Sequence, residues 1–237
     1  MRMISAALDT SCGTAFAVGD DSGIRVDLSL PLAGRDSDKQ LVPWIEQQLS
    51  AAGLSWRDVE RWTVGTGPGS FSGIRVGIAF VQGVCACTRA VYRGLPSSFA
   101  LACVAARDLE VGQSVGVLHD ARRNQLILSV YQLAQCGVRA LGDPEVITPA
   151  DCPRLEEYDV LTTVHGDACR TVLPEALLGK LRVQPSVPAA EHLRAGGGDW
   201  PSTQAEVQAS TEPVYVRPAV FVKPKPVPDF SAFMDNA

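Results

Sequence analysis

The sequence predicts an α/β protein of two lobes, and two observations point to this fold class. The chain opens with short strands joined by Gly, Asp and Ser turns, after which helices and strands alternate. The same series starts again near Gln113. Two successive meanders, each followed by alternating helix and strand, favour two lobes with a boundary at about residues 106–113. We therefore expect a first lobe at 1–108 and a second, diverged lobe with a proline-rich C-terminal tail at 109–237.

Each element of the first lobe follows from a local pattern. Strands are expected where short apolar runs lie between turn residues, at 3–9, 13–20 and 23–30. A helix over 37–54 is expected because apolar residues recur at helical spacing and Gly53 ends the pattern. The remaining elements in chain order are a strand at 61–67, a long and mostly buried helix from Ser70 to about Arg89, a strand at 90–94 and a helix at 97–110.

The second lobe repeats this order without any repeat at the level of residues. Its expected elements are strands within 113–120, 124–133 and 136–148, a helix from Pro149, a strand at 159–167 and a helical stretch after Arg170.

Composition and charge exclude several classes of protein. The chain has 237 residues, 46% of them apolar and 20% charged, as in an ordinary globular protein. Its formal charge of −5 gives no broad basic field for a polyanion, so strong nucleic-acid binding by this chain alone is not expected. The first apolar run ends at Asp9 and is too short for a secretory leader, and no window reaches the length of a membrane span.

The seven cysteines are an odd number, widely scattered and without a Cys-x-x-Cys pair. They indicate neither a disulfide framework nor a zinc ribbon. A cytoplasmic protein with reduced thiols is the expectation.

The glycine-rich segment TVGTGPGSFSGIRVGIAFVQG (63–83) matches no phosphate-binding fingerprint. GTGPGS lacks the Lys of a Walker loop, and Ser70 stands where a Rossmann turn has its third glycine. Because the turn opens a helix, its amides suit either an anion or a plain tight turn. Inside the helix, Gly73 and Gly77 each cost about 0.5–1 kcal/mol relative to Ala. They predict the close approach of another backbone, either a strand of the same lobe or a helix of another chain, and Arg75 between them favours an interface.

Five segments together resemble one family. They are ALDTS (7–11), GTGPGSFSGIRVGIAFVQGV (65–84), HDARRNQ (119–125), VHGDA (164–168) and YVRP (215–218), and they occur in order over nearly the whole chain. This set is similar to the bacterial TsaB (YeaZ) family. The resemblance implies the two-lobed actin/sugar-kinase/Hsp70-like (ASKHA, ribonuclease H-like) fold. It also implies a paralogue of TsaD, the catalytic subunit that completes threonylcarbamoyladenosine beside the anticodon of tRNA.

In that family the chain is a non-catalytic scaffold that dimerises with TsaD through the helices of its first lobe. The TsaE ATPase then joins the pair, and tRNA is bound only indirectly. The resemblance places ATP or ADP with Mg²⁺ at the interface of the complex and no tightly bound cofactor or metal on this chain. A homodimer through the same face is expected as a competing state.

Two groups of residues carry these expectations. The partner-binding group is Phe71, Gly73, Arg75, Gly77 and Phe80, and the vestigial nucleotide-binding group is Asp9, Thr10, Ser11, Gly67 and Gly69. No catalytic residue is assigned. The sequence departs from the family at Asp36, where its members often carry the His of a His-Ser-Glu, and in the tail after Pro218, which has no counterpart.

Enzymatic alternatives remain open from the residues alone. Asp9 ends a first strand, as the metal-holding and phosphate-holding acid does in active members of the superfamily, so an ATPase or phosphotransferase is the second hypothesis. A metal-dependent, glycoprotease-like peptidase is the third, although the three histidines lie far apart and none has a histidine at i+4.

Two further segments were considered for chemistry. GSFSG has Phe where a nucleophile elbow needs Ser, so it does not indicate a serine hydrolase. The HDARRNQ segment suits either an anion site or a hairpin with solvated charges.

Overall fold

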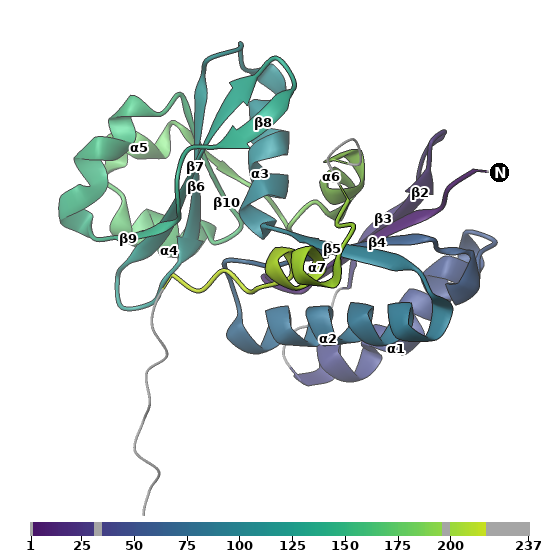
Figure 1. Cartoon of the computed structure of the whole chain (residues 1–237). Coiled ribbons are helices and arrows are strands. Elements are labelled where there is room, and N and C mark those ends of the chain that lie inside the picture. The colour runs from purple at the N-terminus through teal and green to yellow at the C-terminus, as the bar shows by residue number, and fades with distance from the viewer. Residues whose placement is uncertain (1, 31–34, 196–199, 217–237) are drawn as a thin grey trace, which may run out of the picture.

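The computed structural model describes residues 2–30, 35–195 and 200–216 and has two lobes, each built on its own sheet (Figure 1). The tail after Pro218 and the side chain of Asp36, which the sequence singled out, lie outside the described part of the chain.

The first sheet has the strand order β3-β2-β1-β4-β5. Its strands are β1 (Ser5–Asp9), β2 (Thr14–Asp20), β3 (Gly23–Leu30), β4 (Arg61–Gly65) and β5 (Val91–Leu95). The first three form the expected antiparallel meander, while β4 and β5 run parallel to β1.

The second sheet has the order β11-β10-β6-β7-β8, with β9 paired to β7. Its strands are β6 (Ser114–Asp120), β7 (Leu126–Ala134), β8 (Gly137–Ala140), β9 (Glu145–Ile147), β10 (Val160–Thr163) and β11 (Leu181–Val183). β6 has antiparallel β7 on one side and parallel β10 on the other, as β1 has β2 and β4. The two lobes therefore repeat one topology without repeating residues, which confirms the predicted two-lobed α/β fold class.

The helices differ from expectation mainly in the second lobe. The α-helices are α1 (Arg35–Ala51), α2 (Phe71–Thr88), α3 (Ser97–Ala105), α4 (Gly166–Val172), α5 (Glu175–Leu178), α6 (Ala189–Arg194) and α7 (Gln204–Ser210). The described residues also form the 3₁₀ segments η1 (Trp56–Asp58), η2 (Ala106–Asp108) and η3 (Pro149–Glu157). The expected helix from Pro149 is 3₁₀ rather than α, and Pro153 inside it has no backbone N–H for an α-helical bond.

Several helices pack on the lobe that their chain position does not suggest. α1 and α2 lie together beneath the first sheet (Figure 1), and the core between them and the sheet includes the fully buried Trp62. α3 follows the last strand of the first sheet but contacts β6 and β10 of the second. In the other direction, α6 contacts β1 and β2, and α7 contacts β5. The predicted lobe boundary at 108/109 therefore separates the two sheets. It does not separate the helices in the same way, because α3, α6 and α7 each pack on the sheet that lies across this boundary in the chain.

Among the described helices, α2 alone is long and apolar enough to cross a membrane by length and composition, which corrects the expectation that no window reaches that length. It packs Ile74, Ile78 and Val81 into the core against the first sheet, and a core helix of a globular protein passes the same test.

Candidate functional site

The carboxylate of Asp9, at the carboxyl end of β1, is the centre of the predicted nucleotide site, and it is already fully bonded. The residue is 1% exposed. Its Oδ1 accepts hydrogen bonds from the backbone N (2.9 Å) and Oγ (2.6 Å) of Ser11. Its Oδ2 lies 3.2 Å from Nε2 of His192, a buried residue of α6. A Cβ at Gly65 would lie 1.9 Å from the same Oδ2, so only glycine fits beside it.

The pKa of Asp9 reflects this pairing. Burial raises the pKa, but the hydrogen bond and charge of His192, together with the hydroxyl of Ser11, outweigh burial and hold the pKa below its usual range. The group is therefore an ionised carboxylate that is satisfied inside the protein. This arrangement joins β1 to α6, which lies 183 residues further along the chain.

The Gly-Pro-Gly turn between β4 and α2 is closed by contacts within the protein. Gly67 has φ +98°, a conformation that favours glycine. It exchanges two hydrogen bonds with Ser97 at the start of α3, and the N–H of Ser70 donates to the carbonyl of Ser11 at 2.7 Å. The Ser70 Oγ caps α2 by accepting from the N–H of Gly73. Three of the amides expected at an anion site, those of Gly67, Ser70 and Gly73, are thus already in use.

The glycines of α2 have an internal packing role, which corrects the prediction that they admit a partner helix. A Cβ at Gly73 would lie 2.2 Å from the carbonyl oxygen of Thr10, and one at Gly77 would lie 2.3 Å from Thr10 Oγ1. Thr10 Oγ1 in turn donates to the carbonyl of Gly73 at 2.7 Å. The sequence left open whether the close neighbour of these glycines belongs to the same lobe or to another chain. In the structure the neighbour is Thr10, in the same lobe. Gly69 is also required by packing within the lobe, since a Cβ added there would lie 2.4 Å from the carbonyl oxygen of Ser11.

The other predicted partner-binding residues differ in how far their side chains are exposed to solvent. Phe71 is 51% exposed and stacks on Tyr215 with ring centroids 5.1 Å apart. Arg75 covers the Phe71 ring at 3.8 Å and donates through Nε to Tyr215 Oη at 2.9 Å. Phe80 is half-buried and makes edge contacts with Trp56 and Trp62. Tyr215 is therefore anchored at the start of α2, a contact between distant segments that the sequence did not indicate.

Beyond this cluster, α2 presents an apolar groove to solvent. A hollow of about 510 Å³ lies between α2 and η1. It is lined by Trp56, Arg57, Ala79, Phe80, Gly83, Val84, Cys87 and Thr88. A Cβ at Gly83 would meet no atom of the described residues within 4 Å, so this glycine, unlike Gly73 and Gly77, faces open space.

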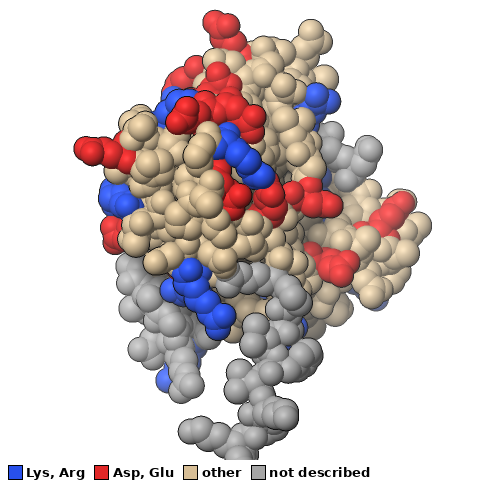
Figure 2. All heavy atoms as spheres, turned by 90° about the vertical axis from the view of Figure 1, so that its left-hand side faces the viewer, with Lys and Arg blue, Asp and Glu red and all other residues tan. Residues whose placement is uncertain are grey.

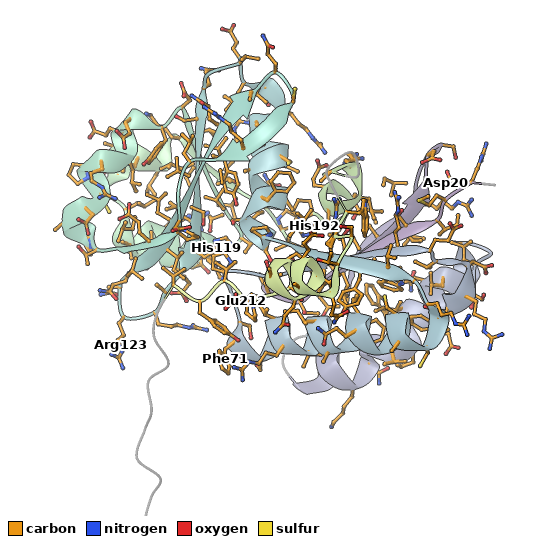
Figure 3. The ribbon with its side chains drawn as sticks, in the orientation of Figure 1. Asp20, Phe71, His119, Arg123, His192 and Glu212 are labelled. Atoms are coloured by element: carbon orange, nitrogen blue, oxygen red, sulfur yellow. The ribbon has the colours of Figure 1, made fainter. Side chains whose placement is uncertain are left out.

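Of the three histidines, which are far apart in sequence, His119 and His165 lie together in the second lobe, and His192 contacts Asp9 of the first lobe; Figure 3 labels His119 and His192. The rings of His119 and His165 are 5.9 Å apart, because β6 and β10 are parallel neighbours that end at the same edge. Within the described part of the chain, neither ring nitrogen of the fully buried His119 has a hydrogen-bond partner. Burial, helped by the charge of His165 and opposed by that of Asp9, lowers the pKa of His119 to about 3. No three His, Cys, Asp or Glu side chains among the described residues form a group that could hold a metal ion.

Within the HDARRNQ segment, residues 122–124 are exposed and have a strained backbone. Arg122, Arg123 and Asn124 all have φ between +54° and +63°, and Arg122 pairs with Asp120 at 3.1 Å. Basic and acidic side chains are interspersed on the face of the second lobe in Figure 2, in keeping with the expected lack of a broad basic field.

Comparisons with known proteins identify the family. The model of the family TsaD, tRNA N6-adenosine threonylcarbamoyltransferase, matches residues 31–162. The chain is 34% identical over 131 residues to the tRNA threonylcarbamoyladenosine biosynthesis protein TsaB of Haemophilus influenzae, which is 52% of this chain and 51% of that protein. The Escherichia coli protein of the same name is 26% identical over 62% of this chain and 64% of its own length. The chain belongs to the TsaD family, in its TsaB (YeaZ) branch. The matches thus span only about half to two thirds of these TsaB proteins.

Solved structures of YeaZ have the same fold as this TsaB-family chain. YeaZ from Pseudomonas aeruginosa superposes with a TM-score of 0.69 at 22% identity, covering 90% of this chain and 99% of its own. A second structure, described as similar to the peptidase YeaZ from P. aeruginosa, gives 0.68 at 24% identity and covers 91% and 100%. The family and the fold expected from the sequence are both confirmed.

Proposed function

We propose that this TsaB-family chain takes part in forming threonylcarbamoyladenosine in tRNA, as a non-catalytic subunit that pairs with TsaD. Family membership supports the pathway, because both curated relatives are biosynthesis proteins of this modified nucleoside. The formal charge of −5 supports indirect rather than direct holding of tRNA.

The state of Asp9 is the observation that carries the non-catalytic role. An acid that holds Mg²⁺ and phosphate needs free oxygen lone pairs that face a cleft. Both oxygens of Asp9 are instead bonded to Ser11 and His192, and the residue is buried beneath α6. These residues do not fit a nucleotide with its metal. We therefore assign any ATP or ADP with Mg²⁺ to the interface of the complex, and no catalytic step to this chain.

The exposed side of α2 supports the pairing role. The groove against η1 and the Phe71–Arg75–Tyr215 cluster lie on the helix that the family resemblance assigns to the partner. An apolar, hollowed surface of this kind is typical of a protein interface. TsaD is the proposed occupant, TsaE joins the pair, and a second copy of this chain competes for the same surface.

Sedimentation of the chain alone and mixed with TsaD of the same organism tests the proposal. We expect a heavier species in the mixture that is absent from either protein alone, with ATP, Mg²⁺ and TsaE added in turn. Independent sedimentation under every condition would reject the pairing role.

A second measurement addresses the lack of catalysis. We expect no magnesium-dependent nucleotide binding by the isolated chain in calorimetry. If such binding appears and Asp9→Ala abolishes it, the chain is an ATPase or phosphotransferase of the superfamily and the non-catalytic role is wrong.

A further inference from the structure

The groove between α2 and η1 is hollow because small residues line one side of it. Ala79, Gly83 and Cys87 follow one another at steps of four along α2, so they share one face of the helix. All three are exposed, and a Cβ at Gly83 would meet no atom of the described residues within 4 Å. The resulting hollow of about 510 Å³ lies in the size range of small-molecule sites.

The other side of the groove is aromatic and held in place from below. Trp56 and Phe80 line it, with ring centroids 5.8 Å apart. Both rings pack on the fully buried Trp62. Trp56 lies nearly parallel to that ring at 6.4 Å, and Phe80 meets it edge-on at 6.1 Å. A flat apolar ring that enters the groove therefore meets a preformed aromatic surface.

Arg57 is the one charged residue among the eight described residues that line the groove. It is exposed and forms no ion pair within the described part of the chain. The neighbouring carboxylate, Asp58, accepts from the backbone N and the Oγ of Ser55, both at 2.7 Å, so it is engaged at the start of η1. An unpaired cation beside an apolar hollow is complementary to a ligand that is apolar with a negative charge at one end.

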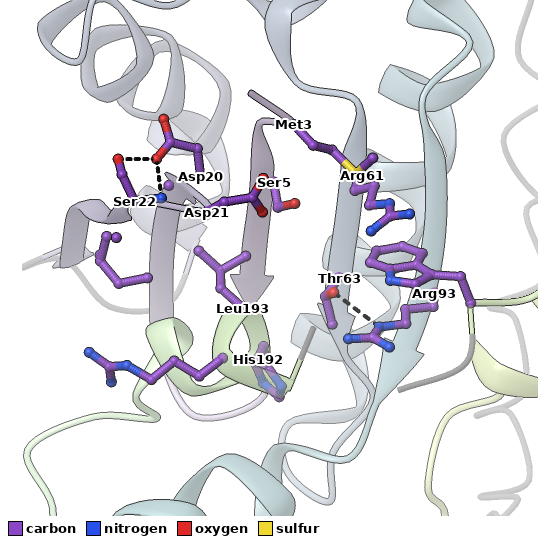
Figure 4. Close-up of a pocket in the computed structure, with 15 residues that line it drawn as sticks. Met3, Ser5, Asp20, Asp21, Ser22, Arg61, Thr63, Arg93, His192 and Leu193 are labelled. Atoms are coloured by element: carbon purple, nitrogen blue, oxygen red, sulfur yellow. Dashed lines mark hydrogen bonds between the residues drawn. The ribbon is translucent and has the colours of Figure 1, made fainter. Parts of the chain in front are cut away.

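The cavity in Figure 4 differs from this groove in both place and chemistry. Side chains alternate along β4, so Trp62 points towards α2 and Arg61 points to the opposite face of the sheet, where that cavity of about 570 Å³ lies. Asp20, Arg61 and Arg93 bring charged groups into its lining, so an apolar ring is expected to favour the groove instead.

We propose that the groove between α2 and η1 binds a small aromatic carboxylate, with its ring on Trp56 and Phe80 and its carboxylate at Arg57. A planar guanidinium matches the two oxygens of a carboxylate. Because the same groove is the proposed docking surface for TsaD, the bound ligand competes with pairing. This consequence rests on the proposed function, whereas the binding itself does not.

Calorimetric titration of the full chain at neutral pH with 1-naphthylacetate, and with its uncharged amide, tests the proposal. We expect saturable binding of both probes, with the acid bound about two- to fivefold more tightly, as for an exposed ion pair. Arg57→Gln should remove this preference for the acid. Gly83→Leu should abolish the binding of both probes, because the added side chain fills the hollow.

Two matched variants locate the site. Gln82→Leu adds the same side chain at an exposed position of α2 that does not line the groove, and Arg61→Gln removes an arginine from the cavity of Figure 4. Both should bind the probes as the wild type does, and circular dichroism verifies that each variant is folded.

Three results would overturn the proposal: no saturable binding by the wild type, normal binding by Gly83→Leu, or a preference for the acid that persists in Arg57→Gln. Equal weakening by Arg61→Gln and Arg57→Gln would also overturn it, because it would place the probe outside the groove. The titration contains no TsaD, so its failure and that of the proposed pairing are separate results.

Discussion

At the scale of single residues, three glycines of α2 occupy different surroundings and predict different effects of the same substitution. The Cβ of Gly77→Ala would meet only the hydroxyl of Thr10 below 3.0 Å, whereas that of Gly73→Ala would meet a backbone carbonyl. We expect Gly77→Ala to lower the free energy of unfolding by about 1–3 kcal/mol, as overpacking does. In a Thr10→Ala background the clash is removed, so the further loss on adding Gly77→Ala should fall near zero in urea unfolding.

Gly73→Ala and Gly83→Ala are the controls for this cycle. Thr10→Ala leaves the carbonyl that faces Gly73 in place, so Gly73→Ala should stay destabilising in both backgrounds. Gly83 faces open space, and its replacement should raise the free energy of unfolding by about 0.5–1 kcal/mol through helix propensity. If all three substitutions changed the free energy of unfolding equally, packing against Thr10 would not be the reason for glycine at positions 73 and 77.

At the scale of elements, the exposed side of α2 predicts where a partner docks. Ala79→Glu puts a charge at the wall of the groove that α2 forms with η1, and Ala79 is already exposed, so the monomer should remain as stable as wild type. We expect the substitution to weaken pairing with TsaD by about tenfold or more, since it buries an unpaired charge at an interface. Sedimentation of the mixture measures the effect.

Gln82→Glu is the matched control for Ala79→Glu. Gln82 is exposed on the same helix but does not line the groove, so the variant should pair with TsaD nearly as the wild type does. If both variants pair normally, the groove is not the docking surface.

The elements themselves show how far local sequence patterns reach. The limits of α2 agree with the helix predicted from Ser70 to about Arg89, and the structure adds that Ser70 caps it. The short strand β11 was taken for part of a helical stretch, because three residues carry too little periodicity. The packing of α3 on the second sheet was also missed, since its uniformly small and apolar residues do not indicate which sheet they contact.

The candidate site was predictable only in part for a related reason. Asp9 was identified from its place at the end of a strand, but its partner His192 is 183 residues away and no spacing rule links them. His119 and His165 likewise became neighbours only once β6 and β10 were paired. Side chains that converge through sheet pairing or through a returning helix leave no local signal in a single sequence.

At the scale of the whole molecule, groups from both lobes meet where α6 returns to the first sheet. His192 of α6 holds Asp9, and Glu191 beside it pairs with Arg107 of η2, at the junction between the lobes. The charge of Asp9 also acts on His119 of β6, the first strand of the second lobe in chain order. The protonation of Asp9 and of His119 is therefore coupled to the folding of the molecule.

This coupling predicts how stability depends on pH. The folded protein keeps His119 neutral down to a pKa of about 3, whereas the unfolded chain takes up a proton near the ordinary value of 6.5. Between these values the unfolded state binds more protons, so the free energy of unfolding falls as the pH is lowered. The slope approaches about 1.4 kcal/mol per pH unit for one such group. His165, whose pKa burial also lowers, acts in the same direction. The lowered pKa of Asp9 adds a loss only in more acid solution, as the pH falls below the ordinary carboxyl value of 3.8.

Urea unfolding of the wild type and His119→Leu at pH 8, 7, 6 and 5 tests the prediction. Leucine fills a similar space without a titrating group or an unpartnered nitrogen, so the variant should be at least as stable at pH 8. From pH 7 to pH 5 the wild type should lose more stability than the variant, because the variant takes up one fewer proton when it unfolds. Parallel losses would mean that His119 accepts a proton in the folded protein, and that the region between the lobes admits water to its ring.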